Sequence, residues 1–229
     1  MLNTYIYLRF YMNIKEKALD TSEIVGKTAL SAIPGGALIT SVYDTVKDNC
    51  LSKRQEKWRT ALEERLVKLE NTLEEIGNDE LFTTALIKAT ELAMKTAKEE
   101  KIAYLANSVI NSLNPDLNEE KLIVFLDLLD RYTVSHIKIL YFFFEPKRFD
   151  GIDPKSYMMG SPSTPLFHVY PELNNELFKK IYGDLYNDGM VSLDNLNITM
   201  SGSGMVAKRT TAIADEFLKF ILEKDEIKN

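Results

Sequence analysis

The sequence predicts a mainly α protein, in which a helical bundle over residues 20–131 precedes a smaller α+β domain over residues 132–229. Apolar residues recur every three or four positions through much of residues 53–144, which is the spacing of one helix face. A Gly-punctuated stretch between two helical patterns in the last third predicts a small β-hairpin. The length of 229 residues exceeds the usual size of one compact domain and also favours two.

The N-terminal region begins with an aromatic segment for which we expect an arm over residues 1–19. This segment lacks the longer apolar stretch and small-residue cleavage site of a signal peptide. Met12 opens a more ordinary start, so either Met1 or Met12 is the native first residue. A helix is expected from about residue 20 to Leu30, with a break at Pro34-Gly35-Gly36 and a restart over 37–46.

No charged residue occurs from Thr28 to Tyr43, and we call residues 28–43 the uncharged run. A spanning helix needs about 20 apolar residues, whereas this run is shorter and contains Thr, Ser, Pro and Gly. Two interpretations follow. The favoured one is a pair of short helices buried in the core, and the alternative is a membrane-active segment over residues 28–46.

Three helical patterns predict the bundle. The first places Trp58, Leu62, Leu66, Leu69, Leu73 and Ile76 on one stripe and ends at Gly77. The second is capped by Asn78 or Asp79 and carries Phe82, Leu86, Ala89 and Ala93 on one face. Ile102, Leu105, Val109, Ile110 and Leu113 continue this second pattern until Asn114-Pro115 stops it. The third, over residues 121–130, is capped by Asn118.

The C-terminal domain should begin with a helix that Thr133 caps and Pro146 ends. Its expected inward residues are Ile137, Leu140, Tyr141 and Phe144. A loop over 147–165 and a short helix near Phe167 should follow, the latter closed by Pro171. The last expected elements are a helix over 174–187, strands over 189–193 and 205–210 joined by a turn at 201–204, and a helix over 211–223.

This order of elements resembles the winged-helix superfamily. Residues 137–144 correspond to its first helix, the turn near Phe167 to its second and residues 176–186 to its recognition helix. Asp188-Gly189-Met190-Val191 looks like the exit into the wing. Residues 211–218 are similar to the Thr-x-x-Gly-x-x-Phe-Leu ending of such domains, with Ala214 in place of glycine. The resemblance implies a helix and a wing that dock against DNA or another protein.

Charge distinguishes these two kinds of partner. If the domain binds DNA, the expected phosphate contacts are Lys179, Lys180, Lys208 and Arg209. However, residues 133–229 contain 11 Lys and Arg against 13 Asp and Glu, and the whole chain has a net charge of −6. Domains that neutralise several phosphates are usually basic. We therefore favour protein contact or a structural role over DNA binding.

Large aromatic residues supply a candidate partner surface, formed by Trp58 and the run Tyr141, Phe142, Phe143 and Phe144. Four consecutive residues cannot all face one side of a helix, so part of the run must cover a second surface. That surface belongs either to a partner or to the helical bundle. Packing between the two domains is favoured because a soluble monomer rarely exposes such a patch.

Catalytic chemistry has little support in the sequence. One cysteine, Cys50, and two histidines, His136 and His168, supply neither a disulfide framework nor a typical zinc site. Gly35-Gly36 lacks the Lys-Ser/Thr end of a phosphate-binding loop, and 201–204 lacks the Gly-x-Ser-x-Gly pattern. Adjacent acidic pairs diverge around a helix instead of converging on a metal. We expect no cofactor, no small-molecule substrate and no enzyme activity.

These observations predict a non-enzymatic adaptor, sensor or regulatory subunit of a bacterial-type cytoplasm, which binds a protein partner or a second copy of itself. The alternatives are a winged-helix DNA-binding regulator and a membrane-acting effector that uses residues 28–46. The apolar, Pro-Gly-Gly-interrupted head followed by a charged helical bundle resembles uncharacterised bacterial proteins associated with phage defence or abortive infection. That resemblance implies a role in antiviral defence.

Overall fold

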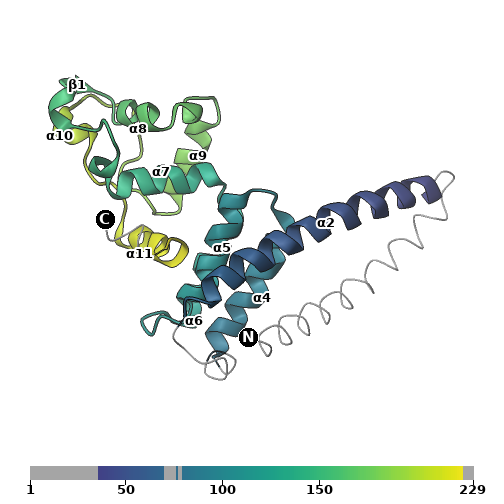
Figure 1. The fold of residues 1–229 in the computed structure, drawn as a ribbon. Coiled ribbons are helices and arrows are strands. Elements are labelled where there is room, and N and C mark those ends of the chain that lie inside the picture. The colour runs from purple at the N-terminus through teal and green to yellow at the C-terminus, as the bar shows by residue number, and fades with distance from the viewer. Residues whose placement is uncertain (1–35, 70–75, 77–78, 224–229) are drawn as a thin grey trace.

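A computed structural model describes residues 36–69, 76 and 79–223. The protein is mainly helical and contains a small two-stranded antiparallel sheet (Figure 1). The expected arm over 1–19 and the expected helix from residue 20 lie outside the described residues, as does the first part of the uncharged run. Among the described helices, none has the length and apolar character that crossing a membrane requires.

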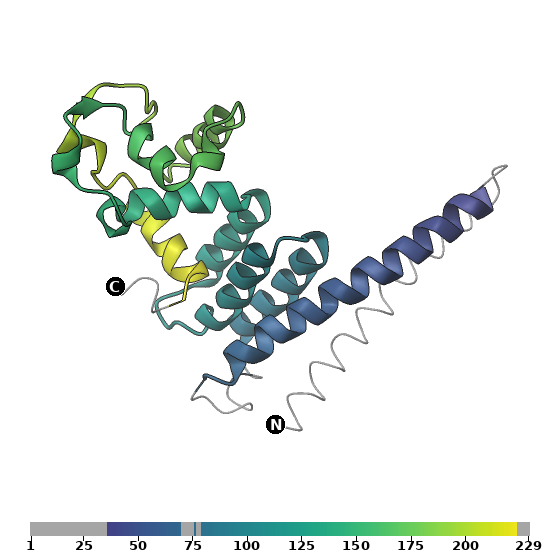
Figure 2. The same ribbon diagram turned by 45° about the horizontal axis from the view of Figure 1, so that its top comes forward.

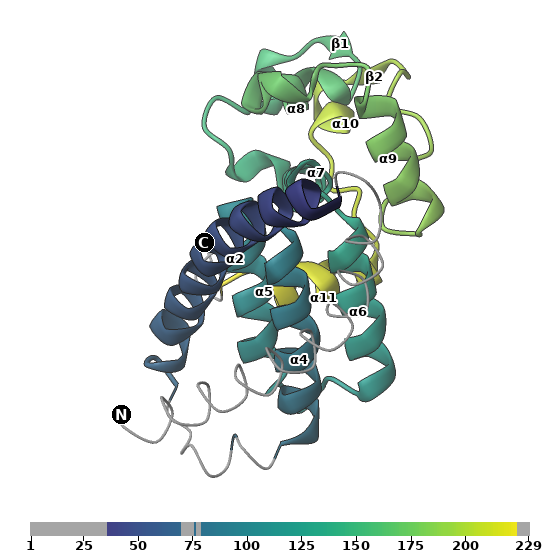
Figure 3. The same ribbon diagram turned by 90° about the vertical axis from the view of Figure 1, so that its right-hand side faces the viewer.

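The first half of the described chain contains four helices, α2 (Gly36–Leu66), α4 (Glu80–Lys95), α5 (Glu99–Asn111) and α6 (Glu119–Arg131). Helix α4 packs against α5 and α6, while α2 lies against α5 and α4 (Figures 1 and 3). The buried residues of α4 include Phe82, Ala89 and Ala93, and those of α5 include Ile102, Leu105 and Val109. The predicted apolar residues therefore face the core, but the pattern expected to continue from Phe82 to Leu113 is divided between two helices, because residues 96–98 are not helical.

Helix α2 differs from its prediction at both ends. It runs without interruption from Gly36 to Leu66, where the sequence suggested one helix over 37–46 and a separate one further on. No Gly or Pro lies between residues 37 and 66, so nothing interrupts the backbone hydrogen bonds. The stripe was also predicted to continue to Ile76, but the helix closes with a turn in which Leu69 N–H donates to Leu66 O.

Side-chain caps begin the helices where local sequence predicted them. The Asp79 carboxylate accepts from Phe82 N–H at 2.8 Å, and the Asn118 amide oxygen accepts from Lys121 N–H at 2.9 Å. Thr133 precedes α7 (Val134–Phe144), and its N–H donates to His136 Nδ1 at 3.1 Å. Each cap satisfies a backbone group or fixes a side chain at a helix start, which confirms these three predicted starts.

The second half combines short elements with two longer helices. The short elements are η1 (Pro146–Arg148), η2 (Pro154–Ser156), β1 (Met159–Gly160), α8 (Ser163–Val169), η3 (Pro171–Leu173), β2 (Met200–Ser201) and α10 (Gly202–Met205). The longer helices are α9 (Phe178–Asn187), which starts four residues after its predicted beginning, and α11 (Ala212–Ile221). Both of these helices pack against α7.

The predicted hairpin strands over 189–193 and 205–210 do not form. These segments share a single antiparallel bridge between Val191 and Thr210. Strand β2 pairs instead with β1, in the register Met159 to Ser201 and Gly160 to Met200. Residues 202–205 form α10 and not a hairpin turn, because the Ser201 hydroxyl accepts from Gly204 N–H and starts a helical turn. A Cβ on Gly202 would collide with backbone carbonyls of the η2 segment.

One hydrophobic core extends through both halves of the described chain. Helix α11, which the sequence assigned to the second domain, packs along α5 (Figure 2). The Phe217 and Phe220 rings of α11 lie 5.6 Å and 5.5 Å from the Phe125 ring of α6. The C-terminal helix thus joins the second half to the first.

The prediction for the inward face of α7 is partly wrong. Ile137 and Leu140 are buried as predicted, but Phe142 and Phe143 are fully buried while Tyr141 and Phe144 are half-buried. Elements pack on more than one side of α7: the Phe142 ring lies 5.4 Å from Phe149, and the Phe143 ring lies 6.2 Å from Tyr182 of α9. A single inward stripe does not describe a helix enclosed in this way.

Candidate functional site

The predicted aromatic partner surface is largely inside the protein. Trp58 is 1% exposed and its Nε1 donates to Thr90 Oγ1 at 3.2 Å. Phe142 and Phe143 are fully buried, and the half-buried Tyr141 ring packs against Phe149 at 5.6 Å. These contacts lie inside each half of the chain, because Trp58 bonds within the bundle and Tyr141 packs within the second half, whereas the favoured prediction was packing between the two domains. They leave no continuous exposed aromatic patch at these positions.

The four candidate nucleic-acid contacts have different surroundings. Arg209 is only 7% exposed. Lys208 Nζ lies 2.5 Å from Asp215 Oδ2 and 4.7 Å from the centre of the Phe144 ring. Lys180 forms an ion pair with Asp184, and Lys179 is exposed. One of the four cations is therefore buried and two are paired with carboxylates, which weakens the basis for contact with a nucleic-acid backbone.

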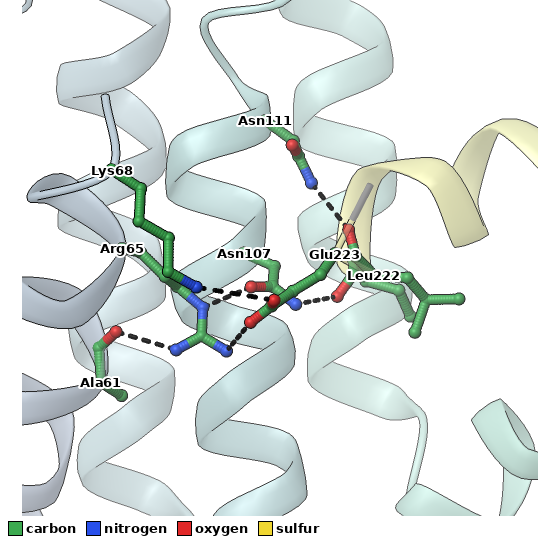
Figure 4. A network of polar contacts seen from close by, with 8 residues as sticks. Ala61, Arg65, Lys68, Asn107, Asn111, Leu222 and Glu223 are labelled. Atoms are coloured by element: carbon green, nitrogen blue, oxygen red, sulfur yellow. Dashed lines mark hydrogen bonds and ion pairs between the residues drawn. The ribbon is translucent and has the colours of Figure 1, made fainter. Parts of the chain in front are cut away.

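The most extensive polar network joins the end of α2 to the end of α11, and sequence reasoning missed it. Arg65, in the last turn of α2, has a side chain only 13% exposed. Its Nε donates to Asn107 Oδ1, its Nη1 to Ala61 O at 2.9 Å and its Nη2 to Glu223 Oε1 at 3.1 Å (Figure 4). Three parts of the chain therefore meet at one guanidinium.

Two asparagines of α5 complete this network. Asn107 is 6% exposed, and its Nδ2 donates to Ile221 O at 2.9 Å. Asn111 Nδ2 contacts three carbonyls at the end of α11, those of Lys219, Phe220 and Leu222, at 3.0–3.2 Å. Figure 4 shows the contact with Leu222. The last carbonyls of a helix have no partner within the helix. Asn111 supplies one from a neighbouring helix.

We call Arg65, Asn107, Asn111 and Glu223 the α2–α11 latch. Lys68 Nζ adds a longer contact of 3.8 Å to Glu223 Oε2. Asn107 and Asn111 lie one helical turn apart on α5, so both face α11. The latch fixes how the end of α2 lies against α11. A polar pair at i and i+4 on the buried face of an amphipathic helix is the signal that could have revealed it.

A second polar cluster, where α6 meets α7 and α9, contains the titratable groups. The Tyr132 and His136 rings stack with centres 4.9 Å apart. The Tyr132 hydroxyl donates to Asp188 Oδ2 at 2.8 Å, and Arg131 Nη2 lies 3.2 Å from the same oxygen. His136 Nε2 faces Asp184 Oδ2 at 3.7 Å.

The electrostatics of this cluster follow from burial and charge. Burial, followed by the hydrogen bond to Asp188, raises the pKa of Tyr132. Burial lowers the pKa of His136, although Asp184 opposes this effect. The hydrogen bond from Lys180 lowers the pKa of Asp184. Because Nδ1 of His136 accepts from Thr133 N–H, a neutral ring carries its proton on Nε2, toward Asp184.

Neither cluster forms a metal centre. Within the described part of the chain, no three His, Cys, Asp or Glu side chains gather closely enough to hold a metal ion. Cys50 is exposed, and Gly151 approaches the ring of His168. Comparisons of the chain with protein-family models, curated proteins and solved structures found no match.

Proposed function

We propose that the protein is a non-enzymatic adaptor or regulatory subunit that binds a protein partner, or a second copy of itself, through the first half of α2. We call residues 36–49 the α2 arm. Figures 1 and 2 show that the arm extends well beyond the other described helices, whereas the second half of α2 crosses α4 and α5. The resemblance noted above suggests bacterial defence as its setting.

The projection of the arm is the observation that carries this proposal. At 1.5 Å per residue, the 31 residues of α2 span about 47 Å. The buried anchors Trp58 and Leu62 lie in the second half of the helix. The arm includes the last eight residues of the uncharged run. A helix gains most of its stability from packing an apolar face, so a projecting helix whose first eight residues carry no charge favours a binding role.

The latch gives the arm a regulatory connection. Arg65 lies in the last turn of the same helix that forms the arm, and it contacts Glu223, two positions after the end of α11. A ligand that moves α11 would therefore change the orientation or stability of α2. The succession of α7, α8 and α9, followed by the Val191–Thr210 bridge, supports a winged-helix-like role for the second half. The buried Arg209 and the paired lysines favour protein as its partner.

Sedimentation of the full chain over a range of concentrations, together with capture of partners on the immobilised chain, tests the proposal. The arm variant Leu38→Glu/Val42→Glu should lose self-association or partner capture, because both charges fall within the arm. Thr60→Glu is the matched control, since Thr60 is exposed on the packed half of the same helix. Association that the arm variant retains and Thr60→Glu abolishes would contradict the proposal.

A membrane-acting effector is the second candidate, favoured by the uncharged run from Thr28 to Tyr43. An amphipathic or apolar helix can lie in a bilayer interface without spanning it. Leakage of dye from anionic vesicles by the full chain would support this function if Leu38→Glu/Val42→Glu abolished it and Thr60→Glu did not. Protein association without leakage would leave the adaptor as the function.

A further inference from the structure

Arg209 is a buried cation in an unusual position. It lies between the Val191–Thr210 bridge and α10 and is only 7% exposed. Its backbone N–H donates to Phe143 O at 2.9 Å, and its backbone carbonyl accepts from Ser192 N–H at 2.9 Å. These bonds fix the residue from two sides, so its side chain must enter the space beside α10.

The side chain has poor partners for a buried charge. Its Nη2 donates to Gly204 O at 2.5 Å and to the Met200 sulfur at 3.0 Å. Its Nε is the one fully buried side-chain nitrogen or oxygen without a hydrogen-bond partner in the part of the chain that the structure describes. No carboxylate among those residues pairs with it. Arginine keeps its charge inside proteins, and a buried charge without a counter-ion is strongly unfavourable.

We propose that Arg209 anchors an oxyanion-binding site, in which a phosphate or carboxylate group pairs with the Nε–Nη2 edge of the guanidinium and displaces the Met200 thioether. The two N–H groups of this edge lie in one plane and match two oxygens of an oxyanion. Nη2 now has two partners, the Gly204 carbonyl and the Met200 thioether, of which the thioether is a weak acceptor. A bound anion accepts the hydrogen bond from Nε and supplies a counter-charge for the guanidinium.

The surroundings allow an anion to enter. Met200 is half-buried, and methionine is unbranched and repacks easily. A Cβ on Gly204 would lie 3.0 Å from Met200 Cβ and 3.4 Å from its sulfur, so a side chain at position 204 would press on the thioether that must move. Lys208, the next residue along the chain, is exposed and adds positive potential, although Asp215 partly neutralises it. The Tyr182 hydroxyl donates to Leu193 O at 2.7 Å, so it is not a further hydrogen-bond donor to the anion.

Nitrogen-15 NMR of arginine Nε groups in the full chain tests the site directly. Inorganic phosphate and acetate are titrated separately against chloride at matched ionic strength, and comparison with Arg209→Lys assigns the signal. At least one of the two oxyanions should shift the Arg209 Nε–H signal saturably. The oxyanion with the lower Kd identifies the ligand class as phosphate or carboxylate. At ten times its Kd, that anion should raise the melting temperature by about 4 °C.

Two variants of the site and one control variant make the test specific. Arg209→Lys retains the charge but loses the paired donors, so it should abolish the saturable stabilisation. Met200→Ala removes the cover and should lower the Kd at least about threefold, a change of roughly 0.65 kcal/mol; this arm also serves if Arg209→Lys fails to fold. Lys179→Met, on exposed α9, should leave the Kd unchanged. A chloride response equal to that of both oxyanions, or the absence of any saturable response, would overturn the proposal.

Discussion

Arg65 Nη2 lies 3.1 Å from Glu223 Oε1, although 158 positions separate these residues in the chain. The contact joins the last turn of α2 to the residue that follows the C-terminal helix by two positions. Asn107 lies beside it and bonds both to Arg65 and to Ile221 O. The latch therefore connects the projecting α2 arm with α11, and its contribution to stability can be measured.

Arg65→Ala should lower the free energy of unfolding by about 2 kcal/mol, because it leaves the buried Asn107 oxygen without a donor. Most of the loss should come from this bond, since Glu223 is 41% exposed and water screens the ion pair. Arg59→Ala is the control, because Arg59 is exposed and forms only a 3.8 Å i,i+4 pair with Glu63. Urea denaturation should show a change within about 0.5 kcal/mol for the control. Equal losses would contradict the role of the latch.

Asn111→Ala should loosen the end of α11, since its amide contacts the carbonyls of Lys219, Phe220 and Leu222. We expect a loss of about 1 kcal/mol, with faster hydrogen exchange in α11 than in α4. Asn114→Ala is the control, because Asn114 is exposed and its side chain accepts only a local bond from Asp116 N–H. Uniform acceleration of exchange in both helices would argue against a specific clamp on α11.

Phe142→Ala should cost about 3–5 kcal/mol, since the ring is fully buried and its removal leaves a cavity. Leu177→Ala removes an apolar side chain that is 66% exposed and should change stability by less than about 0.5 kcal/mol. Thermal and urea unfolding would compare the two. A small effect at Phe142 would show that this part of the aromatic run is not core.

Two glycines of the α9 region should respond to alanine in opposite directions. Gly189 has φ +70°, and Met190 N–H bonds back to Leu185 O in a Schellman arrangement, so Gly189→Ala should destabilise by about 1 kcal/mol. Gly183 lies inside α9, where a Cβ would meet no atom within 4 Å. Gly183→Ala should therefore stabilise by about 0.5–1 kcal/mol. Calorimetry would detect both signs, and the same sign for both variants would refute this assignment.

Stability should fall as the pH is lowered from about 7 to 5. Burial lowers the native pKa of His136 below 6.5, so the unfolded chain binds more protons in this range. Asp184 and Asp188 oppose this shift and Lys101 adds to it. His136→Gln should flatten the dependence in urea titrations at several pH values, whereas His168→Gln should preserve it. A slope that His136→Gln leaves unchanged would assign the dependence to other groups.

The sequence was most informative where structure depends on near neighbours. Asp79 and Asn118 bond to backbone groups three residues away, so their capping could be recognised locally. The apolar faces of α4 and α5 could also be predicted, because their apolar residues recur with the period of a helix and a helix buries its apolar face. The short α8 and its end before Pro171 also followed from local rules.

Contacts between residues that are far apart in the sequence could not be predicted in the same way. Nothing near Met200 indicates that it would pair with Gly160 and not continue a hairpin. Arg209 was expected at the surface, as charged residues usually are, but hydrogen bonds to distant backbone groups hold it inside. The latch was missed because its members come from α2, α5 and the end of α11, which only folding brings together.

The sequence by itself determined the helical character of the protein and where most helices start, because period and capping are properties of neighbouring residues. Only the tertiary structure decided which side chains became buried, how α11 packs on α5, and which cations kept a partner. Those outcomes depend on competition among distant segments for the same core surface and the same hydrogen-bond donors. That competition placed Phe142 in the interior and left Arg209 Nε without a partner.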